Sequence, residues 1–256
     1  MPCSNQYSDA AGSCQPQLRR WVDSSWRWLE RLMWPATCLL CGRGAGEIDL
    51  CGECVADLPR NDPACTMCAE PLPLSAGART CGECLRDPPP FESSFVPYRY
   101  AYPLDHLVRG LKFRNELACG RVLGELFSQC VLARGEPLPE AIVPVPLATR
   151  RYRERGYNQA SELALAIRRV TGIGVKTAVV IRQRETAEQA GLDRKARRKN
   201  VRGAFAAVAA LRARSVAILD DVVTTGSTVR ELAAVLQQAG AEQVAVWAIA
   251  RTAATT

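Results

Sequence analysis

Four Cys-x-x-Cys pairs within fewer than fifty residues constrain this chain more than any other feature. The segment that carries them has few large aliphatic side chains, so it cannot bury enough apolar surface to fold by hydrophobic contact alone. It therefore needs a cross-link of some kind. The pairs are Cys38/Cys41, Cys51/Cys54, Cys65/Cys68 and Cys81/Cys84.

Two such pairs supply the four thiolates of a tetrahedral structural zinc site, so the eight cysteines predict two closed zinc sites. Sequential pairing would combine the first two pairs in one site and the last two in the other. Interleaved pairing would also give two sites. Disulfides, a redox-active pair and an iron–sulfur cluster use the same residues and stay open as alternatives. A closed four-cysteine site leaves no position for a substrate, so it predicts a stabilised fold rather than catalysis.

The N-terminus lacks the basic-then-apolar layout of a signal peptide, and no apolar run reaches the roughly 20 residues of a membrane span. These features predict a cytoplasmic protein with no transmembrane segment. A reducing compartment favours metal binding by paired cysteines over disulfides.

After the cysteines, segments of alternating type predict an α/β fold with a parallel sheet flanked by helices. The expected strands lie near residues 95–100, 141–146, 175–181, 204–208, 215–219 and 243–250, and the expected helices near 105–112, 121–133, 158–170 and 228–239. We expect this domain to span residues 91–256, after a zinc-ribbon region at 36–86. Residues 1–35 are expected to form a disordered tail and a tryptophan-rich amphipathic helix, which packs on the protein or, alternatively, contacts a membrane or partner.

The segment 216–228 carries the most chemistry. Its apolar start delivers the carboxylates of Asp220 and Asp221 to the end of a buried strand, where ligands bind in open α/β sheets. We expect these two residues to be catalytic and to accept hydrogen bonds from sugar hydroxyls. A plain helix N-cap is the alternative, but adjacent acids would bring it no packing benefit. The expected phosphate cradle, beside the free amides of the next helix, consists of Thr224, Thr225, Gly226, Ser227 and Thr228.

The net charge of +7 is concentrated in two segments, residues 150–155 with +3 and residues 182–202 with +5. A local basic cluster implies an anionic ligand. The longer segment has no apolar stripe, and we expect it to be a mobile hood that closes over the substrate. Contact with a nucleic-acid backbone and a plain solvated loop are the alternatives. The expected hood residues are Arg194, Lys195, Arg197, Arg198 and Lys199.

The loop at 216–228 resembles the phosphoribosyl pyrophosphate motif of type I phosphoribosyltransferases. From Cys38 to Arg251 the chain resembles the ComF family, through the cysteine pairs, Val-Pro-Val-Pro, Arg-Gly-Tyr-Asn-Gln, Arg-Lys-Asn-Val-Arg-Gly-Ala-Phe and Leu-Asp-Asp-Val-Val-Thr-Thr-Gly. The resemblance implies a double zinc ribbon before a type I phosphoribosyltransferase-like fold, and a link to DNA uptake in natural competence. It also implies a pyrophosphate loop formed by Arg150, Arg155, Gly156 and Asn158.

The resemblance further implies a protein that binds phosphoribosyl pyrophosphate, or a related ribose phosphate, together with Mg²⁺. Glycosyl transfer at the anomeric carbon would need positioning and charge stabilisation but no protein nucleophile. The sequence contains no recognisable base-binding pocket, so the acceptor is undefined. The alternatives are a nucleotide sensor without turnover and a competence factor that binds single-stranded DNA and works with the DNA-uptake machinery.

Overall fold

A computed structural model describes residues 36–74, 77, 79–184 and 199–253. The expected tryptophan-rich helix lies outside these residues, as do Arg194, Lys195, Arg197 and Arg198 of the expected hood. Among the described helices, none combines the length and the apolar character needed to cross a membrane.

A parallel sheet forms the centre of the molecule. Its strands follow the order β1-β8-β7-β3-β4, and β2 also pairs with β8. The longest pairing joins β7 to β8, from Ser215 opposite Gln243 to Val223 opposite Arg251. The strands are β1 Ser93–Phe95, β2 Tyr98–Arg99, β3 Ala141–Pro144, β4 Gly174–Val175, β7 Ser215–Val223 and β8 Gln243–Arg251.

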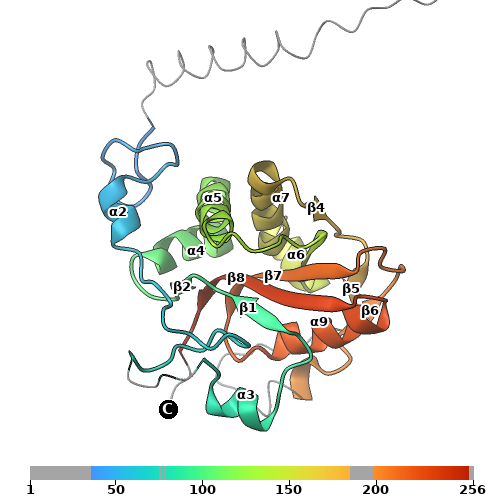
Figure 1. The fold of residues 1–256 in the computed structure, drawn as a ribbon. Coiled ribbons are helices and arrows are strands. Elements are labelled where there is room, and N and C mark those ends of the chain that lie inside the picture. Colours follow the sequence, from blue (N-terminus) through green and yellow to red (C-terminus); the bar gives the residue numbers. More distant parts are fainter. Residues whose placement is uncertain (1–35, 75–76, 78, 185–198, 254–256) are drawn as a thin grey trace, which may run out of the picture.

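Helices cover both faces of this sheet. In Figure 1, α4, α5 and α7 lie over one face and α9 lies on the other. Alternate residues of β7 accordingly enter two separate hydrophobic clusters, Ala217 and Leu219 in one and Val216 and Ile218 in the other. The predicted fold class, a parallel sheet flanked by helices, is therefore confirmed. The helices are α4 Leu104–Phe113, α5 Leu117–Ala133, α6 Thr149–Arg155, α7 Gln159–Thr171 and α9 Ser227–Gln238.

The two cysteine-rich parts attach to opposite faces of the sheet. The first ribbon, residues 36–58 with the short helix α2 (Gly52–Ala56), contributes Leu50 and Leu58 to the cluster under α4 and α5. The second ribbon, residues 63–86 with α3 (Gly82–Arg86), contributes Ala69 to the cluster on the α9 face. Figure 1 shows α2 and α3 well apart, on these two sides.

Proline explains two expected strands that the structure divides. The segment 95–100 becomes β1 and β2, because Pro97 between them has no N–H to donate. The segment 175–181 splits into β4 and β5 (Val180–Arg182). The pairing of β4 with β3 ends at Ile142, two residues before Pro144, which has no N–H to continue it. Strand β5 pairs antiparallel with β6 (Phe205–Ala207) in a separate two-stranded sheet.

Two further differences lie beside the candidate site. The expected pyrophosphate loop begins as the helix α6, because the residues from Thr149 to Arg155 include no glycine or proline and Arg150 pairs with Glu154 one turn later. Gly156, at φ 80°, ends it. Strand β7 does not stop at Leu219 but runs through both acidic residues to Val223, because β8 continues beside it.

Candidate functional site

Each ribbon gathers four cysteine sulfurs within 4.8 Å of one another, Cys38, Cys41, Cys51 and Cys54 in the first cluster and Cys65, Cys68, Cys81 and Cys84 in the second. The pairing is therefore sequential. None of the eight forms a disulfide. Two neighbouring sulfurs in each cluster lie 3.6 Å apart, a distance that suits ligands of one ion and exceeds the S–S bond length of about 2.05 Å.

Backbone amides support this interpretation in the second cluster. The amide of Cys81 donates to the sulfur of Cys65 at 3.3 Å, and the amide of Cys84 donates to the sulfur of Cys81 at 3.5 Å. Such donors stabilise thiolates, the form in which cysteine binds metals. Both clusters are thus compatible with structural zinc sites.

A cavity of 570 Å³ opens at the carboxyl ends of β3 and β7, bordered by the end of α4, the helices α6 and α7, and the start of α9. This is the edge at which parallel α/β sheets bind their ligands. Its polar lining consists of Lys112, Arg151, Glu154, Arg155, Asn158, Gln159, Arg182, Asp220, Asp221, Thr224, Ser227 and Thr228.

The acidic wall of the cavity is the run from Asp220 to Thr228. Burial and the adjacent Asp221 carboxylate raise the pKa of Asp220 to about 7, and Lys112 opposes this rise. Asp220 accepts a hydrogen bond from the amide of Asp221 at 2.9 Å, and Asp221 accepts one from the amide of Val222 at 2.6 Å. Each carboxylate is therefore held by the backbone amide that follows it, and the charge of Asp221 acts on Asp220.

The predicted phosphate loop, Thr224 to Thr228, leads into α9. Its N-cap residue, Gly226, has φ 74° and no side chain with which to cap the helix, and the amide of Ser227 donates a long hydrogen bond of 3.5 Å to the hydroxyl of Thr225. The loop side chains divide between two sides. Thr224, Ser227 and Thr228 line the cavity, whereas Thr225 lines a small void behind the loop and its hydroxyl lies 2.9 Å from that of Ser227.

The basic wall carries the cations Lys112 on α4 and Arg151 and Arg155 on α6, together with the neutral amides Asn158 and Gln159 at the start of α7. Lys112 bridges the cavity, with its Nζ 3.0 Å from Asp221 Oδ1.

Tertiary contacts hold the three helices of the basic wall together. The hydroxyl of Tyr157 donates to the carbonyl of Leu111, next to Lys112. The guanidinium of Arg155 lies 5.4 Å from the centre of the Phe113 ring. The Asn158 side chain caps α7 by accepting from Ala160 N at 3.0 Å, and it donates to the carbonyl of Val145 at 2.9 Å.

Gln159 has an incomplete hydrogen-bond set. It is 2% exposed and lines the cavity, and its amide nitrogen has no partner among the described residues. Because buried polar groups are almost always hydrogen-bonded, this nitrogen is a donor available to a ligand.

The structure brings together most, but not all, of the residues predicted for the site. Arg150 has a side chain that is 77% exposed and pairs with Glu154 at 2.9 Å, and neither it nor Gly156 lines the cavity. Arg151 takes the lining position instead. Lys199, the one expected hood residue that is described, is exposed. Sequence reasoning missed Lys112, since it is a single cation in an element far from the recognisable motifs. Arg182 begins the basic segment 182–202 singled out in the sequence, but it was not among the expected hood residues.

Comparisons with known proteins agree with this architecture. Residues 29–85 match the family model of the double zinc ribbon domain. The DNA utilization protein YhgH of Escherichia coli K12 is 35% identical over 224 residues, which cover 85% of this chain and 98% of that protein. Competence protein F of Haemophilus influenzae is 35% identical over 209 residues, or 79% of this chain and 90% of that protein.

Among solved structures, the glutamine phosphoribosylpyrophosphate amidotransferase of B. subtilis matches with a TM-score of 0.33 at 22% identity, over 50% of this chain and 25% of that one. At that score the fold assignment depends on the sheet topology described above. With the ordered cysteine pairs, the phosphate loop and relatives matched over nearly their full length, the chain belongs to the ComF family.

Proposed function

We propose that the cavity binds phosphoribosyl pyrophosphate, or a related ribose 5-phosphate, and that the protein is a phosphoribosyltransferase. The observation that carries the proposal is the uncapped start of α9, which opens on a cavity whose two walls carry opposite charges. A helix N-terminus without a side-chain cap offers its amides to a phosphate. The basic wall offers complementary charge to a diphosphate.

Each part of such a ligand has a matching group. The 5-phosphate would bind the loop from Thr224 to Thr228, and the ribose hydroxyls would donate to the acidic pair. The diphosphate would lie toward Lys112, Arg151 and Arg155, and the buried amide of Gln159 would donate a hydrogen bond to the ligand.

The acidic pair also suits Mg²⁺, which favours carboxylate oxygens together with ligand phosphates. Burial, and after it the negative charge of Asp221, raise the pKa of Asp220, and a bound cation would stabilise the charged carboxylate against both. Asp220 and Asp221 would hold the ion, which would supply charge neutralisation for the departing diphosphate.

In the proposed reaction, an acceptor attacks the anomeric carbon and forms a bond to it, while the bond from that carbon to the diphosphate oxygen breaks. The chain's own contribution is to position the sugar and to stabilise the leaving charge. A calorimetric titration with phosphoribosyl pyrophosphate, with and without Mg²⁺, tests binding. Release of pyrophosphate in the presence of nucleobases or amines tests turnover. Absence of binding would reject the site, whereas binding without release would indicate a sensor.

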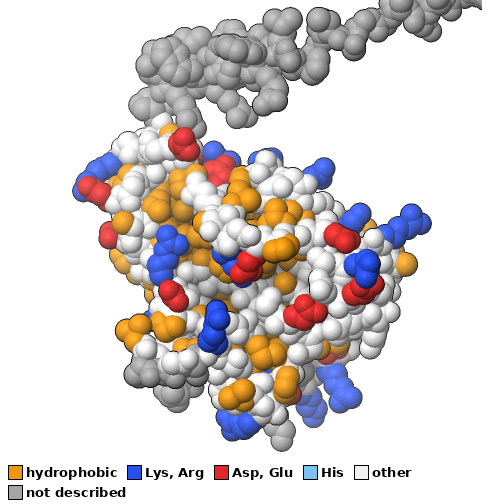
Figure 2. Space-filling model, viewed as in Figure 1, with side chains coloured by type: hydrophobic (Ala, Val, Ile, Leu, Met, Phe, Trp, Pro, Cys, Tyr) orange, Lys and Arg blue, Asp and Glu red, His pale blue; other side chains and the backbone are white. Residues whose placement is uncertain are grey.

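The names of the relatives suggest a DNA-related role as a second candidate. On the face shown in Figure 2, however, the described Lys and Arg side chains are interspersed with Asp and Glu, so that face presents no continuous basic track. Trp247, on β8, is only 5% exposed and cannot stack on a base. If the chain binds single-stranded DNA, the logarithm of its affinity should fall linearly with log salt, by roughly 0.7 per phosphate neutralised. A slope near zero would exclude direct binding.

We also propose that both cysteine clusters hold zinc. Elemental analysis of protein purified without added metal should find about two zinc ions per chain, as expected for two four-thiolate sites. A zinc content near zero, or the visible absorption of an iron–sulfur cluster, would contradict this assignment.

A further inference from the structure

A buried arginine connects the second ribbon to the back of the phosphate loop. Arg251, the last residue of β8, is 2% exposed. One nitrogen of its guanidinium, Nη2, lies 2.6 Å from Glu70 Oε2 in the second ribbon, and the other, Nη1, donates to the backbone carbonyl of Thr224. These two contacts of Arg251 thus link Glu70, in the turn that carries Cys65 and Cys68, to Thr224 at the candidate ligand site.

The second cysteine cluster fixes the position of Glu70. Cys65 and Cys68 begin the turn, Cys65 N donates to the carbonyl of Glu70 at 2.8 Å, and Ala69 N donates back to the carbonyl of Cys65 at 2.7 Å. Ala69 itself has φ 56°, a left-handed conformation that the turn must impose on a residue with a side chain. A metal held by these cysteines would therefore fix the carboxylate that holds Arg251.

A second contact joins the same ribbon to α9. Arg230, in the first turn of α9, donates to the carbonyl of Asp87 at 2.9 Å and lies 3.6 Å from its carboxylate. Cys68, Cys81 and Cys84 also line the small void behind the loop together with Thr225 and Gly226.

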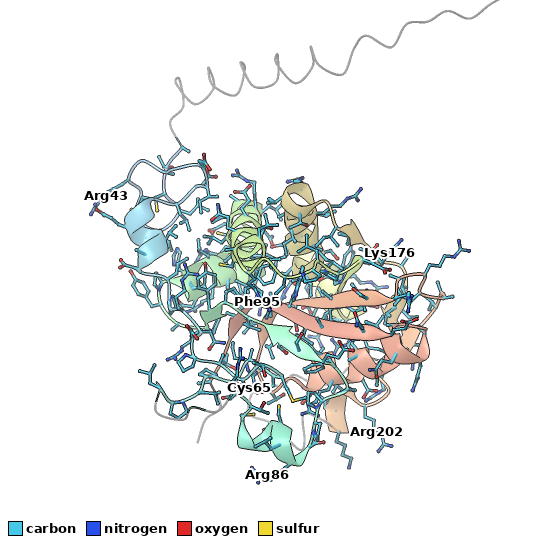
Figure 3. The ribbon with its side chains drawn as sticks, in the orientation of Figure 1. Arg43, Cys65, Arg86, Phe95, Lys176 and Arg202 are labelled. Atoms are coloured by element: carbon cyan, nitrogen blue, oxygen red, sulfur yellow. The ribbon has the colours of Figure 1, made fainter. Side chains whose placement is uncertain are left out.

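The first ribbon makes no such connection among the described residues. Its ion pair to the main domain joins Asp49 to Arg121 on α5. Figure 3 shows the separation, with Cys65 close to the strands and Arg43 of the first ribbon at the far end of α2.

We propose that Arg251 is a positioning residue, through which the second ribbon holds the phosphate loop in its ligand-binding conformation. A carbonyl engaged by Arg251 cannot turn toward the cavity and repel a phosphate, so the loop presents its amides and hydroxyls instead. The inference rests on the proposed function for its ligand. Its effect on the loop itself can be measured without any ligand.

The test uses the full chain and two matched double variants. Glu70→Leu with Arg251→Met removes the ion pair behind the loop and leaves no unpaired buried charge, a replacement that folded proteins often tolerate. Asp49→Leu with Arg121→Met removes the corresponding pair of the first ribbon. Arg251→Lys is a third, conservative variant that keeps the charge and a donor. Elemental analysis first establishes which variants retain their full metal content.

Hydrogen exchange of the amides from Thr225 to Thr228 is the first readout. We expect exchange at least about tenfold faster in the Glu70/Arg251 variant, partial rescue in Arg251→Lys, and no change in the Asp49/Arg121 variant, since one lost hydrogen bond to a charged group changes an equilibrium by about that factor or more. Affinity for ribose 5-phosphate, measured by calorimetry, should fall by a similar factor in the first variant only.

Unchanged loop exchange in the Glu70/Arg251 variant would overturn the inference. So would equal acceleration in both double variants, because that result would indicate general destabilisation. If the unmodified protein fails to bind ribose 5-phosphate or phosphoribosyl pyrophosphate, the proposed function fails, but the exchange experiment still decides whether Arg251 positions the loop.

Discussion

The acidic wall of the cavity comes from nine consecutive residues, Asp220 to Thr228, whereas the basic wall combines side chains from α4, α6 and α7. The acidic wall gets its shape from one strand, one loop and the start of one helix. The basic wall exists only because tertiary contacts such as Tyr157 to Leu111 hold its three helices together. The comparison shows that the shape of the acidic wall is set by one local segment, whereas the shape of the basic wall depends on how separate helices pack.

Lys112 is the point at which the two walls meet. Its Nζ lies 3.0 Å from Asp221 Oδ1, so the two charges are paired. A bound diphosphate or Mg²⁺ would compete for these same groups. The Lys112–Asp221 pair would then have to exchange partners, which would reduce the net gain in binding free energy.

The strongest way to break the acidic wall is the double change Asp220→Asn with Asp221→Asn. Each removes a charged acceptor for a ribose hydroxyl, a loss of about 1.5–3 kcal/mol, so phosphoribosyl pyrophosphate affinity should fall by about two to four orders of magnitude. Calorimetry measures the affinity and circular dichroism checks the fold. Glu242→Gln, at an exposed acid paired with Arg214, is the control and should bind normally.

The basic wall should respond less strongly to Lys112→Met. We expect affinity for phosphoribosyl pyrophosphate to fall about tenfold to a hundredfold, the loss of one charged hydrogen bond. The pKa of Asp220 should also rise further, because Lys112 opposes its rise in the unmodified protein. Carboxyl NMR signals followed against pH measure that pKa. Arg109→Met, at an exposed position of the same helix, should change neither quantity.

The pH dependence of the free energy of unfolding tests the raised pKa of Asp220. Asp220 has its pKa raised from 3.8 to about 7, so the folded state binds this proton more tightly and stability should fall as the pH rises from about 4 to about 7. Each pKa unit corresponds to about 1.4 kcal/mol, and we expect solvent in the cavity to reduce the net effect to about 1–2 kcal/mol. Asp220→Asn should therefore be more stable than the unmodified protein at pH 8.

Urea unfolding of both proteins at pH 4.5 and pH 8 measures this difference. The two stabilities should converge at the lower pH, and the metal sites contribute equally to both proteins. A constant difference between pH 4.5 and pH 8 would show that Asp220 does not titrate in this range.

The smallest expected effect distinguishes two neighbouring arginines on α6. Arg151→Ala should weaken binding of phosphoribosyl pyrophosphate about twofold to fivefold, because a partly exposed cation contributes about 1 kcal/mol or less. Arg150→Ala should have almost no effect, since Arg150 lies outside the cavity lining and pairs with Glu154. The opposite order would restore Arg150 as the ligand contact predicted from the sequence.

The sequence predicted the acidic wall more completely than the basic wall. The predicted phosphate loop and the cysteine clusters are local patterns whose chemistry depends on spacing, and the helix expected near 158–170 begins directly after Asn158. Lys112 was not predicted, because nothing near it in the sequence indicates that α4 ends beside Asp221. Arg150 and Arg151 are adjacent and chemically identical, so only the orientation of α6 decides which of them lines the cavity.

The sheet order has a consequence for how the protein is made. Strand β1, the first of the sheet, pairs with β8, the last, and Glu70 and Arg251 are separated by 181 positions. A ribosome therefore releases the second ribbon long before its partners exist, and if its cysteines bind zinc as proposed, they can do so before the sheet has formed. Contacts of such long sequence separation form slowly. We expect metal supply during synthesis, more than the final stability, to determine the yield of folded protein.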